Sequence, residues 1–181
     1  MNYEELRELA LNTGFTHTVP LDISTIELKQ EVRDMCKQGC QQYAKRWSCP
    51  PGCGSLEQLC SDIFQYEGGI LVQTTAKLED SFDWDGMMKT QSQHQKNFVR
   101  FVEKLHSSDV RFLPLGTGCC MICETCSYPD SPCRFPQKKI SSMEACGMLV
   151  SEVCQKNDLK YYYGPNTISY VAGVLFMDFS L

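Results

Sequence analysis

Twelve cysteines in a chain of 181 residues are the feature of this sequence most able to do chemistry. Ten of them gather in two stretches, about residues 36–60 and 118–136, with none between. The first stretch contains Cys36, Cys40, Cys49, Cys53 and Cys60, and the second contains Cys119, Cys120, Cys123, Cys126 and Cys133. Thiolates are soft ligands that select iron–sulfur clusters, zinc and copper(I). The spacing therefore predicts metal chemistry in two local loops.

The second stretch carries the more specific pattern. Cys120-Met-Ile-Cys123-Glu-Thr-Cys126 is a C-x2-C-x2-C sequence, and Cys133 follows it. This pattern resembles the ferredoxin-type loops that hold a [4Fe–4S] cluster, although there a proline directly follows the fourth cysteine and here Pro136 comes three residues later. The resemblance predicts these four cysteines as ligands. Because a [4Fe–4S] cluster with four thiolates carries net negative charge, we also expect a cation beside it, and Arg134 directly follows Cys133.

The first stretch is looser and leaves two possibilities open. Its spacing is Cys36-x3-Cys40-x8-Cys49-x3-Cys53. Four thiolates here could hold a second [4Fe–4S] cluster, so we predict these four as its ligands. Alternatively only the first three bind, which leaves one iron with an open position that can act as a Lewis acid. Cys60 and Cys119 compete with Cys53 for the fourth place.

Zinc is the main alternative metal. A structural zinc site usually pairs two C-x2-C units, which leaves no use for a third cysteine at the same spacing. The histidines, His17, His94 and His106, all lie away from the cysteine stretches in the sequence. The zinc interpretation is strongest for the first stretch. Cys146 and Cys154 sit in an apolar helical pattern, which predicts small buried side chains rather than ligands.

Charge and hydropathy narrow the class of protein. The 17 basic and 22 acidic residues give a net charge of −5, so we expect no nucleic-acid partner. The N-terminal residues show no signal-peptide pattern, and no apolar stretch approaches the roughly 20 residues that cross a bilayer. We therefore expect a cytoplasmic protein without a membrane partner, in a compartment that keeps thiols reduced and disfavours disulfides.

Hydrophobic periodicity predicts a scaffold of helices and strands around these loops. The expected helices cover residues 3–12, 24–36, 55–66, 86–106 and 141–155. The expected strands cover residues 15–21, 70–75, 110–115, 159–163 and 167–176, the last two around a turn at Gly164-Pro165-Asn166. This order predicts an α+β or α/β fold, as a single compact domain over residues 1–181 with a small mixed sheet flanked by helices.

Three of these helices are predicted from capping boxes, in which a serine at the N-cap is followed three residues later by Glu or Gln. The pairs are Ser24 with Glu27, Ser55 with Gln58, and Ser141 with Glu144. The third helix should also turn its positive N-terminus toward the anionic metal centre.

The combined motifs resemble a known family. They are Cys36-x3-Cys40-x2-Tyr43, Ser48-Cys49-Pro50-Pro51, Cys120-x2-Cys123-Glu124-x-Cys126, Cys133-Arg134-x-Pro136 and Ser142-Met143-Glu144-Ala145. This combination is similar to the prokaryotic, cysteine-rich group labelled "predicted metal-binding proteins", a domain of unknown function. The resemblance implies one metal site built from both cysteine groups, and it implies no particular reaction. Cys53, Cys60, Cys119 and Cys146 do not match its pattern.

Three functions follow as hypotheses. The first is a redox module whose [4Fe–4S] clusters, one or two, pass single electrons to a partner protein. The second is an enzyme in which an open iron binds a small substrate for sulfur transfer or elimination. The third is a zinc-stabilised, non-catalytic interaction domain. Ligands from two subunits of a homo-oligomer could also share one site.

Overall fold

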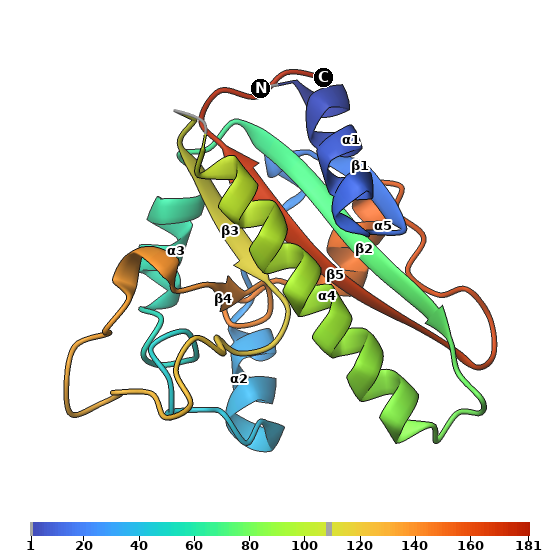
Figure 1. Ribbon diagram of the computed structural model, residues 1–181. Helices are drawn as coiled ribbons and strands as arrows, with labels where there is room; N and C mark the ends of the chain where they lie inside the picture. Colours follow the sequence, from blue (N-terminus) through green and yellow to red (C-terminus); the bar gives the residue numbers. More distant parts are fainter. Residues whose placement is uncertain (1, 108–109) are drawn as a thin grey trace.

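A mostly antiparallel sheet of five strands organises the computed structural model, which describes residues 2–107 and 110–181 (Figure 1). The strands are β1 (His17–Leu21), β2 (Gly68–Lys77), β3 (Phe112–Gly116), β4 (Ser141–Ser142) and β5 (Thr167–Phe176), and they lie in the order β1-β2-β5-β3-β4. Every pair is antiparallel except β3 with β4. The fold is therefore α+β, as predicted.

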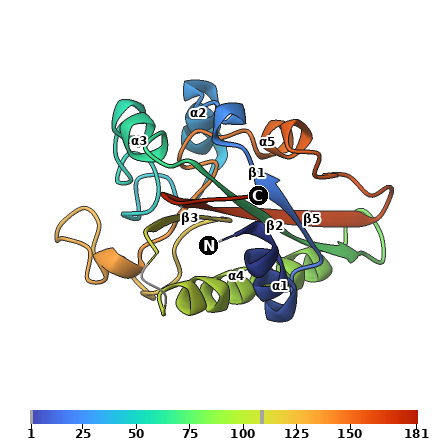
Figure 2. The ribbon, with the colours of Figure 1, turned by 90° about the horizontal axis from the view of Figure 1, so that it is seen from above.

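Helices cover both faces of this sheet (Figure 2). They are α1 (Tyr3–Thr13), α2 (Gln30–Gly39), α3 (Leu56–Ile63), α4 (Trp84–Leu105) and α5 (Val150–Lys156), with 3-10 turns η1 (Ile23–Thr25) and η2 (Pro136–Lys138). Figure 2 shows α1 and α4 on one face and the other three on the opposite face. In the described ranges no helix combines the length and the apolar character that crossing a bilayer requires.

The two long central strands explain why the sheet needs cover on both sides. β2 and β5 pair over ten residues, with Ile70 opposite Val174 and Leu71 opposite Gly173. Because successive side chains of a strand point to opposite faces, Ile70 packs toward Phe101 of α4, whereas Leu71 packs toward α3 and α5. Two apolar cores result, and each is fully buried at its centre.

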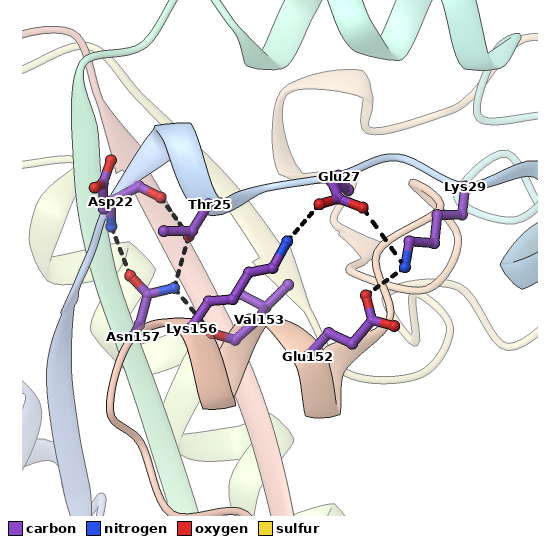
Figure 3. A network of polar contacts seen from close by, with 8 residues as sticks. All are labelled: Asp22, Thr25, Glu27, Lys29, Glu152, Val153, Lys156 and Asn157. Carbon is purple, nitrogen blue, oxygen red and sulfur yellow. Dashed lines mark hydrogen bonds and ion pairs between the residues drawn. The ribbon is translucent and has the colours of Figure 1, made fainter.

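The first predicted capping box is wrong. Ser24 lies inside the 3-10 turn η1, and α2 begins only at Gln30 without a side-chain cap. Glu27 does not turn back to Ser24, because its carboxylate pairs with Lys29 and with Lys156 of α5 (Figure 3). Ion pairs with another helix therefore replace the local cap.

The same network holds residues 22–29, which include η1, against α5 and the residue that follows it. The side chain of Asn157 accepts from the Asp22 N–H (2.8 Å) and donates to Thr25 Oγ1 (2.8 Å). At the other end of this segment, Lys29 pairs with Glu152, also of α5 (Figure 3). These bonds deliver the chain to the start of α2, which carries the first cysteines.

The third predicted capping box is also wrong. Ser141 and Ser142 form the short strand β4 beside β3, and α5 begins at Val150. Gly147 lies between them with a φ of +94°, which ends any helical turn. A Cβ at this position would meet Leu56 and the Lys29 backbone at about 3 Å, so close packing holds the chain there. No helix N-terminus at residue 141 faces the cysteines.

The other predicted elements are present, with one exception. The capping box at Ser55 and Gln58 is confirmed, with both of its hydrogen bonds formed. The exception is residues 159–163, which do not pair as a strand. Instead the side chain of Gln73 in β2 donates to Lys160 O (2.9 Å) and accepts from the Tyr163 hydroxyl (2.9 Å). Two hydrogen bonds of one side chain thus take the place of the backbone hydrogen bonds that a strand would have formed.

Candidate metal centre

The two cysteine stretches meet at the edge of the sheet near β3 and β4, on the side away from the termini (Figure 1). Arg46 of the first stretch donates from Nη1 to the carbonyls of Cys120 (3.0 Å) and Cys123 (3.4 Å). The Ser48 hydroxyl accepts from the Cys120 N–H (3.1 Å). A side chain of the first loop thus fixes the backbone of the C-x2-C-x2-C segment.

An aromatic contact joins the loops a second time. Trp47 packs edge-on against Tyr128, with ring centroids 4.9 Å apart, and its indole N–H donates to Ser131 O (2.9 Å). Gly52 makes this approach possible, because a Cβ there would lie 2.9 Å from the Tyr128 ring and 2.8 Å from Arg46 O. The two loops therefore behave as one packed unit although about 70 residues separate them in sequence.

Four cysteines of the second stretch line one small hollow. They are Cys120, Cys123, Cys126 and Cys133, and they are the four predicted ligands of that stretch. The lining includes three cations, Arg46, Arg134 and Lys139, and no histidine or carboxylate. Such a donor set, purely sulfur and surrounded by positive charge, suits an anionic thiolate–metal centre.

Backbone amides also favour a thiolate in this hollow. Burial by itself would raise the pKa of Cys126, but hydrogen bonds from the N–H groups of Tyr128, Trp47 and Ser127, with the charge of Arg46, lower it below its usual range. Hydrogen bonds to a thiolate stabilise its charged form. The lowered pKa makes ionisation of Cys126 easier, which favours metal binding by its thiolate.

Arg134 lines the same hollow, as its position beside Cys133 predicts. Its Nη1 donates to Thr125 O at 2.8 Å and so closes the loop across the interval from Cys126 to Cys133. The guanidinium thus has a structural bond and also adds positive charge beside the four thiols.

The first stretch brings its thiols together around the C-terminal end of α2. Burial raises the pKa of Cys49 to about 11, a hydrogen bond with Ser48 lowers it, and the neighbouring thiols of Cys119, Cys40 and Cys53 raise it further. Burial also raises the pKa of Cys36, with further contributions from its neighbours. These mutual effects require the thiols to lie near one another.

Cys119 lies near thiols of both groups. Burial raises its pKa, Arg46 lowers it, and Cys120 and Cys40 raise it. Cys60, the other candidate fourth ligand, lies on α3 and does not appear among the groups that influence these thiols. Cys119 and Cys53 both raise the pKa of Cys49, so these two thiols lie near it.

A buried arginine faces the first group. Arg33 is only 7% exposed, and no carboxylate pairs with it in the described part of the chain. Its Nη2 donates to Gly54 O (2.7 Å) and approaches Cys53 Sγ at 3.8 Å. A buried cation is unfavourable without a counter-charge. Negative charge on the adjacent sulfurs would therefore stabilise Arg33.

Two further cysteines, Cys146 and Cys154, lie in the apolar core against which Cys53 packs. Cys154 and Cys146 are buried, as predicted, and burial raises the pKa of each to about 12. Cys53 further raises the pKa of Cys146 and Arg33 lowers it, so this buried thiol lies close to the first group. Burial likewise raises the pKa of the Glu144 carboxyl, which in turn raises that of Cys36.

The spacing of the donors tests which metal centre they fit. Among residues 2–107 and 110–181, no three His, Cys, Asp or Glu side chains meet as a group that could hold one metal ion. Four sulfurs around one zinc stand only about 3.8 Å apart, given Zn–S bonds of about 2.3 Å. In a [4Fe–4S] cluster each thiolate binds a different iron, so its sulfurs stand farther apart. The donor set of the hollow is all sulfur, which both kinds of centre can use.

The hollow lined by the four cysteines of the second stretch is narrow for a [4Fe–4S] cluster. Its free space is about 20 Å³, room for about one water molecule. Residues 117–135 contain no helix or strand, so this loop can widen without breaking a regular element.

Sequence reasoning missed Arg33, and it placed Arg46 beside the first loop without its contact with the second. Arg33 and Cys36 are three residues apart on α2, which places them on the same helix face, and this spacing could have pointed to Arg33. The contact of Arg46 with Cys120 and Cys123 carries no such signal, because it depends on the meeting of two distant loops.

Two groups of converging thiols at the rim of an α+β sheet define a cysteine-rich protein with the ligand set of a metal centre. A family model described as "predicted metal-binding protein (DUF2284)" matches residues 19–176. The chain belongs to this family of predicted metal-binding proteins, as its motifs indicated. No curated protein and no solved structure gives a match.

Proposed function

We propose that this chain is an iron–sulfur protein that holds two adjacent [4Fe–4S] clusters and serves as a redox module. Cys120, Cys123, Cys126 and Cys133 would bind the second cluster. Cys36, Cys40 and Cys49 would bind the first, with Cys119 or Cys53 as the fourth ligand. When bound, these clusters would supply one-electron transfer to a redox partner protein.

One observation carries this proposal: four thiols line a single hollow together with three cations, and its lining contains no histidine or carboxylate. The family supports metal binding without identifying the metal. The chain's own residues would have three tasks at these centres. Arg33 and Arg46 balance the negative charge, the N–H groups around Cys126 stabilise its thiolate, and Trp47 limits access of water.

The consecutive residues Cys119 and Cys120 connect the two centres. Cys119 lies near Cys40 and Cys49 of the first group, and Cys120 lines the hollow of the second. Consecutive Cα atoms are only about 3.8 Å apart, so centres held by these two residues are neighbours. Proximity of this kind suits a pair of one-electron carriers.

Metal analysis of protein purified without oxygen tests the proposal. We expect a brown protein with about eight iron atoms and about eight acid-labile sulfides per chain, the content of two clusters. Cys123→Ala should remove about half of the iron and Cys49→Ala the other half. Cys154→Ala is the matched control, since this buried thiol lies outside both groups, and it should keep all of the iron.

Other results would overturn the proposal. A colourless, zinc-loaded protein would favour the zinc-stabilised interaction domain. Folded protein without iron and labile sulfide would refute the clusters altogether. Equal iron loss in Cys123→Ala, Cys49→Ala and Cys154→Ala would refute the ligand assignment.

A second function, the open-iron enzyme, is favoured by the unequal exposure of the first group. Cys40 is exposed whereas Cys49 is buried, so one side of this group is open to a small molecule. The electron-spin spectrum of the reduced protein would then change when a small ligand such as cyanide is added. An unchanged spectrum would favour the redox module.

A further inference from the structure

A cavity of about 600 Å³ opens between α4 and the segment that follows β3. Phe98 and Val102 of α4 line it together with Ile140, and both Cys119 and Cys120 reach its surface. Its volume lies within the range of about 300–1,000 Å³ that small-molecule sites occupy. The family description covers a metal site and does not assign this cavity.

The walls favour a flat, largely apolar molecule. Phe98 and Val102 are buried beneath the cavity, whereas Val99 (46%), Met121 (65%) and Ile122 (44%) are well exposed around it. Aromatic rings and methionine sulfur make favourable contacts with the faces and edges of aromatic ligands. Exposed apolar side chains gathered at one concavity are typical of a ligand site rather than of ordinary surface.

The polar groups of the cavity mostly donate hydrogen bonds. Lys138 takes part in none of the ion pairs between described residues, and His106 lies across from it on the α4 side. Gln95 is already committed, because its Nε2 donates to Thr117 O at 2.9 Å. Glu103 is the single carboxylate of the lining. A carbonyl oxygen on the ligand would satisfy Lys138 or His106.

The charge of the ligand follows from its neighbours. The lining itself contains one carboxylate, Glu103, and one ammonium group, Lys138. Glu103 would repel an anion and Lys138 would repel a cation, whereas an uncharged carbonyl compound meets neither repulsion.

We propose that this cavity binds a neutral, flat aromatic molecule that carries a carbonyl oxygen. Its rings would lie against Phe98 and Met121, and its oxygen would accept a hydrogen bond from Lys138. Bound there, the molecule would touch the Cys119–Cys120 peptide that joins both cysteine groups.

The probe for the test is Prodan, a neutral naphthyl ketone dye whose emission shifts to the blue in apolar surroundings. Titrated into the anaerobically purified full chain, it should bind saturably with one site per chain. The anionic naphthalene dye ANS is the matched comparison, and we expect it to bind more weakly than Prodan because Glu103 repels its sulfonate.

Three variants locate the site. Val99→Trp fills the mouth of the cavity and should weaken Prodan binding at least about tenfold. Arg100→Trp is the control, because this exposed residue lies next along α4 and does not line the cavity. Lys138→Ala should weaken binding about threefold, as the loss of one hydrogen bond predicts.

Several outcomes would overturn the inference. They are equal weakening by Arg100→Trp, tighter binding of ANS than of Prodan, and a dimer in solution that Val99→Trp dissociates, which would make a second copy the occupant. Iron and sulfide measured on the same samples separate the two proposals. Brown protein that fails to bind Prodan refutes only the cavity, and colourless protein that binds it refutes only the clusters.

Discussion

The sheet and the cysteine loops are stabilised in different ways. In the sheet, side chains such as Phe101 and Phe176 are fully buried between regular elements, and hydrophobic burial supplies the main favourable free energy. In the loops, residues 40–55 and 117–135 contain no helix or strand and depend on bonds from Arg33, Arg46 and Trp47. The difference indicates that the sheet can fold without metal, whereas the order of the loops should depend on it.

Removal of the metal should give the largest difference between the two regions, because the loops should lose protection against hydrogen exchange and the sheet should keep it. After anaerobic treatment with a chelator, amides of residues 117–135 should exchange hydrogen at least about tenfold faster, because ligand bonds no longer hold the loop. Amides of β2 and β5 should keep their protection. Hydrogen exchange read by mass spectrometry measures both in one sample. If both regions lost protection together, metal and core would form a single cooperative unit and the comparison would fail.

A substitution that leaves a cavity in the apolar core should lower the stability of the sheet and leave the iron content unchanged. Phe101→Ala removes a fully buried ring from the face covered by α4 and should lower the free energy of unfolding by about 3–5 kcal/mol. Iron per folded molecule should not change, since the ring lies far from the thiols in the second core. Urea unfolding with iron analysis measures both. Phe82→Ala, at a position 92% exposed, should change neither quantity.

Acidification should destabilise the sheet through His94. This side chain is fully buried, and burial lowers its pKa from 6.5 to about 3, so it stays neutral when folded. The unfolded chain binds a proton there below about pH 6.5, so stability falls as the pH falls from 6.5 toward 3. Between pH 7.5 and pH 5 the loss is about 2 kcal/mol.

The variant His94→Gln should abolish this part of the pH dependence in urea titrations at the two pH values. Its amide can still reach Thr74 Oγ1, the 2.9 Å partner of His94 Nδ1. His17→Gln, a change at the partly exposed end of β1, should keep the full dependence. An unchanged slope in His94→Gln would mean that other groups titrate.

The smallest effect is expected where the two regions join. Ser55 caps α3 directly after the first cysteine loop, and its hydroxyl accepts from the Gln58 N–H (3.2 Å). Ser55→Ala should cost about 1 kcal/mol of unfolding free energy. Ser151→Ala, at an exposed position inside α5, should cost nothing measurable in the same thermal unfolding assay. Equal effects would show that the cap at Ser55 is not formed.

The regular elements were largely predictable because their signals are local. The long helix around Phe98 and Phe101 and the strand at residues 70–75 follow from apolar periodicity, and both are present. The capping boxes at Ser24 and Ser141 failed for a tertiary reason. Glu27 forms ion pairs with α5, and Ser141 pairs with β3, so contacts with distant segments replaced the local cap.

The sequence by itself determined which thiols are present, the spacing that brings Cys120, Cys123, Cys126 and Cys133 around one hollow, and the family. Spacing within a loop fixes how far apart its donors can lie, so these four needed little outside help. Only the tertiary structure decided that Cys119 lies near Cys40 of the first stretch, and that Arg46 bonds to the second loop. Those relations arise where β3 and the end of α2 bring together segments about 70 residues apart, and no local pattern encodes that meeting.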